Sequence, residues 1–137
     1  MSVQIRRIQY YTANVADRIG SAYQVLEELA NAKVDLEAFS CVPVGPNSVQ
    51  LTLFPDDPHH LERVAGTVGL TLMPPQQAFL VHGEDEIGVL AELHRRLFDA
   101  QVSVYASNGV THPAGSFGYL IYVRPDDYER AARILDC

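Results

Sequence analysis

The chain has 137 residues, of which 47% are hydrophobic and 20% are charged. These proportions are typical of a globular protein with a buried core, and they exclude a disordered chain. Seventeen acidic residues against ten basic ones give a formal net charge of −7, which argues against a partner such as nucleic acid, whose backbone is itself negative.

The sequence also argues against a membrane protein and against a metal centre. No apolar run approaches the roughly 20 residues that a membrane helix needs, and residues 1–7 lack the apolar core of a secretory signal peptide. We therefore expect a cytoplasmic protein with no membrane partner. Two cysteines, Cys41 and Cys137, make neither a zinc knuckle nor a disulfide framework, and we expect no metal and no cofactor.

The first half of the chain alternates between strand and helix patterns. Val3–Tyr11 predicts a strand, with a bulge near Arg6 and Arg7 because the apolar residues change faces there. Apolar residues at helical spacing from Ala22 to Ala32 predict the first helix. The later elements that the pattern predicts are strands at Val34–Val42 and Val49–Leu53, a helix opened by Pro58, and a short strand at Leu70–Met73.

Pro74 and Pro75 mark a junction, so we expect one module at residues 1–74 and a second at 75–137. The elements predicted after the junction are a strand at Ala78–Val81, a helix at Glu86–Ala100, strands at Val102–Ala106 and Phe117–Val123, and a last helix that ends near Cys137. The second module therefore has no closing strand. Its first strand, Ala78–His82, would be a bare edge, and we expect either the first copy or a second chain of a homodimer to cover it.

The chain is an internal duplication. Asp17–Gly20 and Asp85–Gly88 lie 68 residues apart, and each precedes a predicted helix. The match continues at the same offset through the pairs Leu29 and Leu97, Ala32 and Ala100, Val34 and Val102, Leu36 and Val104, Ala38 and Ala106, Leu51 and Tyr119, and Leu53 and Ile121. A repeated core pattern with a repeated loop predicts two copies of one small module.

The repeated loop has the chemistry to hold an amino acid. Gly20 and Gly88 have no Cβ, so the backbone can approach a ligand or adopt a positive φ. The amides that follow begin a helix, where free N–H groups favour a carboxylate. Asp17, or Asp85 with Glu86, could receive an ammonium group. The alternative is purely structural, in which the aspartate caps the helix and the glycine makes the turn.

The chain resembles a tandem pair of ACT domains. The residues that carry the resemblance are an Asp-x-x-Gly turn before the first helix of each copy, in Asp17–Ser21 and Asp85–Leu90, and the apolar positions after it. The family commonly has proline before the glycine, where this chain has Ile19 and Ile87. The resemblance implies an α+β fold of two ferredoxin-like βαββαβ modules, the second lacking its last strand, with antiparallel sheets and helices on one face.

The resemblance also implies a function without catalysis. ACT domains are regulatory modules that bind small molecules, most often amino acids, at the interface of domains paired side by side. It implies a homodimer with ligand against the loop of one module and a strand end of its neighbour, where Asn108 aligns with Ser40. The expected ligand-binding residues are Asp17, Arg18, Ile19, Gly20, Ser21, Asp85, Glu86, Ile87, Gly88, Val89 and Asn108.

Two other functions fit parts of the sequence. His82 and Glu84, with His94 or His112, could form a metal site built from strands, as in a metal-dependent lyase or dioxygenase of the glyoxalase type. In that module, however, one helix is followed by three strands, whereas here each third strand is followed by a helix. The other possibility is a protein-interaction module that binds no small ligand.

Overall fold

The computed structural model describes residues 3–137, and contacts divide it into two compact modules. The first module comprises Gln9–Gln76, and the second comprises Gln77–Cys137 together with residues 3–8. The boundary expected between residues 74 and 75 follows the repeat in the sequence. The compact modules differ from it because the start of the chain is grouped with the second copy.

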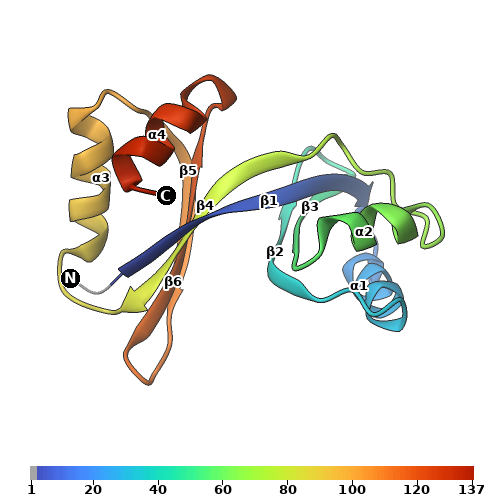
Figure 1. The fold of residues 1–137 in the computed structure, drawn as a ribbon. Helices are drawn as coiled ribbons and strands as arrows, with labels where there is room; N and C mark the ends of the chain where they lie inside the picture. The colour runs from blue at the N-terminus through green and yellow to red at the C-terminus, as the bar shows by residue number, and fades with distance from the viewer. Residues whose placement is uncertain (1–2) are drawn as a thin grey trace. The chain divides into compact units, whose positions relative to one another are not determined.

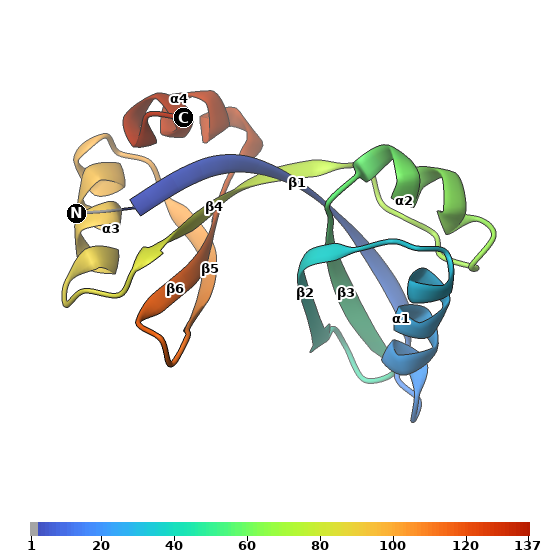
Figure 2. The ribbon, with the colours of Figure 1, turned by 60° about the horizontal axis from the view of Figure 1, so that its bottom comes forward.

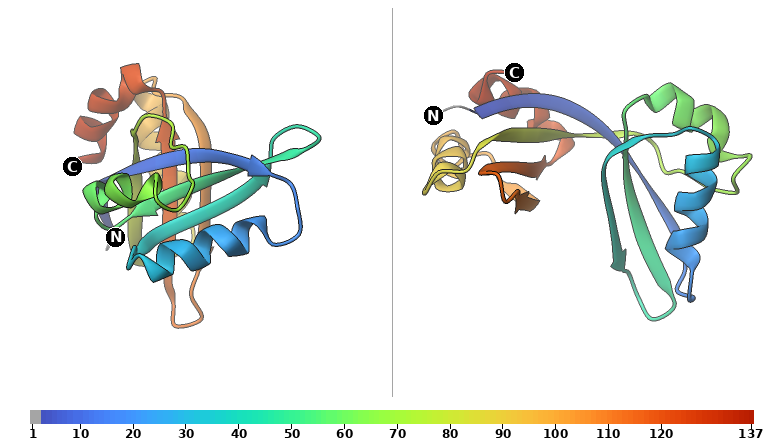
Figure 3. Two further views of the ribbon diagram at one scale, coloured as in Figure 1. Left: turned by 90° about the vertical axis from the view of Figure 1, so that its right-hand side faces the viewer. Right: turned by 90° about the horizontal axis from the view of Figure 1, so that it is seen from below.

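The first module has three antiparallel strands and two helices (Figure 1). β3 is central, pairing with β1 on one side, where Leu53 lies opposite Tyr11, and with β2 on the other, where Leu51 lies opposite Cys41. Both helices lie on one side of these strands (Figure 2; right panel of Figure 3). The elements are β1 (Val3–Ala16), α1 (Ser21–Asn31), β2 (Leu36–Pro43), β3 (Ser48–Pro55) and α2 (Pro58–Ala65).

The strand predicted at Leu70–Met73 is wrong. This segment is irregular and forms no strand. The N–H of Met73 donates to the carbonyl oxygen of Thr12 at 2.9 Å. Leu70 is nevertheless buried and belongs to the core of the first module. The apolar residues that suggested a strand are thus explained by packing of a coil.

The second module repeats the order of the first. β6 is central, with β4 on one side and β5 on the other, and the N-terminal part of β1 lies beyond β4. Tyr119 on β6 lies opposite Gly109 on β5, the same register as the pair Leu51 and Cys41 in the first module. The elements are β4 (Gln76–Glu84), α3 (Val89–Asp99), β5 (Val104–Thr111), β6 (Ser116–Val123), a short 3-10 helix (Pro125–Asp127) and α4 (Tyr128–Leu135).

Residues 3–8 supply the strand that the second copy of the repeat, residues 75–137, does not itself contain. Val3 and Ile5 pack against the second core, and Arg7 Nη1 lies 2.9 Å from Glu129 Oε2 on α4. On the other face of the strand, the Oε1 atom of Gln4 is 2.7 Å from Nε2 of His82. The expectation that the β4 edge is covered is therefore confirmed, and the first copy provides the cover.

β1 is a continuous strand, and the bulge predicted near Arg6 and Arg7 is wrong. Ile8 and Tyr10 caused the apparent change of faces because they are buried on the side opposite to the helices. The odd-numbered residues keep one face throughout, with Val3 and Ile5 on the second core and Tyr11, Ala13 and Val15 on the first.

The predicted fold class is confirmed as α+β, with antiparallel strands and four helices. Leu29 on α1 and Leu97 on α3 occupy equivalent positions and are both fully buried. Each helix therefore packs its apolar face on its own strands, as the repeated spacing predicts. No helix within residues 3–137 is long and apolar enough to cross a membrane.

Candidate ligand-binding site

The two repeated loops have the same backbone conformation. Gly20 has φ 87° and ψ 0°, and Gly88 has φ 89° and ψ 0°. Both glycines immediately precede a helix and lie in the left-handed region, where a Cβ is unfavourable. Neither helix start has a side-chain cap. The structural alternative is therefore wrong in having Asp17 or Asp85 cap its helix, and correct in having the glycine make the turn.

The hydrogen bonds of the two loops also match. The N–H of Asp17 donates to the carbonyl of Asn47 at 2.9 Å, and the N–H of Asp85 donates to that of Gly115 at 2.7 Å. At the start of α3, the N–H of Val89 donates to the carbonyl oxygen of Glu86 at 3.2 Å. The next two amides, those of residues 90 and 91, have no acceptor among the described residues, as expected in the first turn of a helix.

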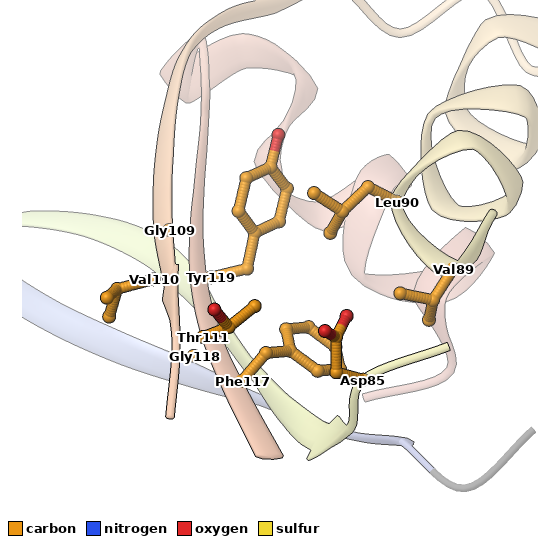
Figure 4. A pocket seen from close by; sticks show the side chains of 9 residues that line it. All are labelled: Asp85, Val89, Leu90, Gly109, Val110, Thr111, Phe117, Gly118 and Tyr119. Carbon is orange, nitrogen blue, oxygen red and sulfur yellow. The ribbon is translucent and has the colours of Figure 1, made fainter. Parts of the chain in front are cut away.

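A pocket of about 430 Å³ lies in the second module, between the start of α3 and the β5–β6 hairpin (Figure 4). Its volume is within the usual range for small-molecule sites. In Figure 4 the carboxylate of Asp85 lies close to Phe117 and Thr111, while Leu90 faces the ring of Tyr119. The lining residues are Asp85, Val89, Leu90, Gly109, Val110, Thr111, Phe117, Gly118 and Tyr119.

The ring of Tyr119 forms one wall of this pocket and is held from two directions. Its hydroxyl is 2.7 Å from Nε2 of His94 on α3. Its other end lies directly over Gly109, where a Cβ would be 2.5 Å from Cδ1 of Tyr119 and 2.8 Å from the carbonyl oxygen of Gly118. Gly109 is therefore required by this close approach and not by a positive φ.

The second loop contributes part of what was expected. Asp85 and Val89 line the pocket, whereas Glu86, Ile87 and Gly88 do not, and the side chain of Ile87 is fully exposed. Gly88 still positions α3 through its left-handed turn. These assignments locate the residues, and their role in binding remains a prediction.

Asn108 does not line the pocket. It lies opposite Leu120 on β6, one residue before Gly109. Because successive side chains of a strand point to opposite faces, the Asn108 side chain is directed away from the face that carries Tyr119. Sequence reasoning missed Gly109 and Tyr119, although an isolated glycine within a strand is a known sign of close approach.

The first loop lies beside a different and smaller space. Arg18 and Ser21 line a pocket of about 210 Å³, together with residues of α1 and Val68. Asp17, Ile19 and Gly20 are not part of its lining. The hydroxyl of Ser21 donates to the carbonyl of Ala16 at 2.8 Å, so it is already engaged. The predicted residues of the two loops are thus not brought into equivalent sites.

The histidines proposed for a metal site are held apart. Residues 3–137 contain no group of three or more His, Cys, Asp or Glu side chains placed to hold a metal ion. His82 contacts Gln4, His94 contacts Tyr119, and His112 Nδ1 accepts from the N–H of Ala114 at 3.0 Å. A helix follows the third strand in each module, which differs from the order of the glyoxalase-type module.

Comparisons with known proteins show the fold. No protein-family model matches the sequence, and no curated protein matches it. Protein BT0572 from Bacteroides thetaiotaomicron is 13% identical, with a TM-score of 0.82 over 96% of this chain and 88% of that chain. The ligand-free regulatory subunit of aspartate kinase from Thermus thermophilus is 15% identical, with a TM-score of 0.62 over 98% and 94%.

A third structure places the same fold within a larger enzyme. Escherichia coli aspartokinase III, in complex with aspartate and ADP, is 17% identical to this chain, with a TM-score of 0.54. The match covers 98% of this chain but 32% of the kinase. Together with the Thermus thermophilus regulatory subunit, it shows that this chain shares the fold that its resemblance to a tandem pair of ACT domains implies.

Proposed function

We propose that this protein is a non-catalytic regulatory module that binds an amino acid in the pocket beside its second loop. The observation that carries the proposal is the pocket itself, because it joins a carboxylate to the open start of a helix. The Asp85 carboxylate lies at one end, and Leu90, whose amide has no acceptor among the described residues, forms another wall.

This arrangement offers a partner for each charge of a zwitterion. An ammonium group would bind the carboxylate of Asp85, with a charge-assisted hydrogen bond. A carboxylate would bind the free amides at the start of α3, where the helix dipole is positive. The aspartate kinase regulatory subunits with the same fold support a regulatory role, and the E. coli structure is a complex with aspartate.

The proposal includes a homodimer. β5 is the edge strand of the second module, and its exposed residues Gly109, Val110 and Thr111 border the pocket. A module of a second chain paired along β5 would complete the interface at which ACT domains hold ligand. The first loop, Asp17–Ser21, would then be a second and weaker candidate site.

The experiment is a thermal-shift screen of the wild type against the twenty amino acids and divalent metal ions. A ligand at a hundredfold its dissociation constant should add about 2.7 kcal/mol to the free energy of unfolding. We expect an amino acid to stabilise the protein and Asp85→Asn to abolish the effect. The matched control is Asp17→Asn, which changes the equivalent position of the first loop and should still be stabilised by the amino acid.

The other functions give different results. Stabilisation by a metal ion that is lost in His82→Ala would support the lyase or dioxygenase. No response to any amino acid or metal would contradict the proposal and favour an interaction module. Loss of the amino-acid response in Asp17→Asn but not in Asp85→Asn would move the site to the first loop.

A further inference from the structure

The chemistry of the pocket lining restricts the ligand. We propose that the pocket selects an amino acid with an apolar, uncharged side chain; this rests on the proposed function and goes beyond it by naming the ligand class. Among the nine lining residues, Asp85 is the one with a charged side chain. Val89, Leu90, Phe117 and Tyr119 form an apolar surface around the rest of the space.

None of the described residues that line the pocket has a basic side chain, and the arginines of α3 are engaged elsewhere. Arg95 lies 2.6 Å from Glu92 and 2.8 Å from Asp99, and its hydrogen bond lowers the pKa of the Glu92 carboxyl. Arg96 donates to the carbonyl of Ile134 at 2.6 Å. Within one chain, a side-chain carboxylate on the ligand would therefore lack a cation, and an unpaired charge is costly to remove from water.

His94 and His112 are not among the residues that line the pocket. The Nε2 atom of His94 is 2.7 Å from the Tyr119 hydroxyl, and His112 uses Nδ1 to accept from the N–H of Ala114. A ligand with a cationic side chain meets a different limit, because Asp85 is the single carboxylate of the lining. Once Asp85 holds the α-ammonium group, a second cation has no partner there.

The apolar walls favour a ligand side chain that they can bury. Phe117 and Tyr119 are almost fully buried and therefore fixed, while Leu90 is 38% exposed and can lose more surface when a ligand binds. Each methylene group removed from water between such walls raises affinity by about fourfold. A branched aliphatic side chain between Leu90 and Tyr119 would make use of this surface, and glycine would not.

The apolar walls are specific to the second module. At the offset of 68 residues, four of the wall residues correspond to smaller or more polar ones in the first module, whereas Gly109 corresponds to the larger Cys41. The pairs are Val89 with Ser21, Leu90 with Ala22, Gly109 with Cys41, Phe117 with Val49, and Tyr119 with Leu51. At these four positions the second copy therefore has bulkier apolar side chains around its loop than the first copy.

The test compares four probes by calorimetric titration of the wild-type chain: leucine, glycine, aspartate and lysine. We expect leucine to bind at least about tenfold more tightly than each of the other three. Leu90→Lys places a cation in the wall at a partly exposed helix position, so it should weaken leucine binding and strengthen aspartate binding. The matched control Ala22→Lys makes the equivalent change on α1 and should alter neither.

The outcomes separate this inference from the proposed function. If aspartate, lysine or glycine binds as tightly as leucine, and Asp85→Asn abolishes that binding, the inference is overturned and the proposed function stands. If none of the twenty amino acids binds, both are overturned. A circular-dichroism melt of Leu90→Lys matching the wild type establishes that lost leucine binding does not come from unfolding.

Discussion

The two modules share a backbone but not a pocket. Their loops have glycines at nearly the same φ, equivalent hydrogen bonds to the facing hairpin, and the same strand register. In the second module, the small Gly109 allows the ring of Tyr119 to lie across β5, and a pocket of about 430 Å³ remains beside Asp85. In the first module, the corresponding pair is Cys41 and Leu51.

This comparison distinguishes the residues that form the turn before the helix from the side chains that form the pocket. The turn depends on the glycine and on hydrogen bonds within a few residues, so both copies have it. The space depends on which side chains the neighbouring strands place against the helix start. Under the proposed function, the repeated motif marks two places where ligand could bind, and the walls distinguish the second place from the first.

The largest effect should come from the equivalent core leucines. Leu29→Ala and Leu97→Ala each remove a fully buried side chain, and such changes cost about 2–5 kcal/mol of unfolding free energy. Because the positions are equivalent, we expect similar costs, each confined to its own module. Urea unfolding followed by amide hydrogen exchange measures both the cost and its location. A cost below about 1 kcal/mol at one position would show that the two cores are not alike.

A smaller effect should follow from charges placed on the shared strand. Ile5 and Val15 lie on the same face of β1, but Ile5 packs against the second core and Val15 against the first. Ile5→Asp and Val15→Asp should each lower the free energy of unfolding by about 1–3 kcal/mol, because each places a charge at a partly buried apolar position. We expect Ile5→Asp to accelerate amide exchange in β4 and β6, and Val15→Asp to accelerate it in β3.

The matched control for this strand is Ile5→Leu, which keeps an apolar side chain and should change exchange little. If Ile5→Asp instead left the amides of β4 protected, residues 3–8 would not be the cover of that edge. The two halves of β1 would then not serve the two modules in the same way, but the comparison of the two loops would still stand.

The last comparison, with an expected cost no larger than that of the strand charges, concerns the wall of the pocket. In Gly109→Ala, the new Cβ would lie 2.5 Å from the Tyr119 ring, and overpacking of this kind costs about 1–3 kcal/mol. Cys41→Ala changes the corresponding exposed residue and should stay within about 0.5 kcal/mol of the wild type. Thermal unfolding of the two variants side by side measures this difference. Equal stability of both would show that the ring moves freely.

The sequence predicted those features that depend on residues close together in the chain. The duplication, the antiparallel strands and the helix start after Gly20 are present in the structure. The helix predicted at Glu86–Ala100 begins three residues later, at Val89. The wrong predictions came from apolar residues whose burial has another cause. Leu70 is buried as part of a coil, and Ile8 and Tyr10 are buried on the second face of β1.

Part of the pocket lining was predicted because the second loop is a local motif. Asp85 and Val89 were named from the sequence and line the pocket. Tyr119 was not, because its contact with Gly109 depends on the register of the β5–β6 hairpin, and its hydrogen bond with His94 joins residues 25 positions apart. Asn108 was placed one position from the strand residue that faces the pocket.

The amino-acid sequence alone therefore determined that the chain is duplicated, about where its helices lie, and that each repeated loop carries a carboxylate, because turns and helix periodicity are properties of short segments. Only the tertiary structure decided that residues 3–8 complete the second module and that its loop borders a walled pocket. Both depend on contacts between distant residues, such as Gln4 with His82, and no local pattern specifies which distant strands will pair.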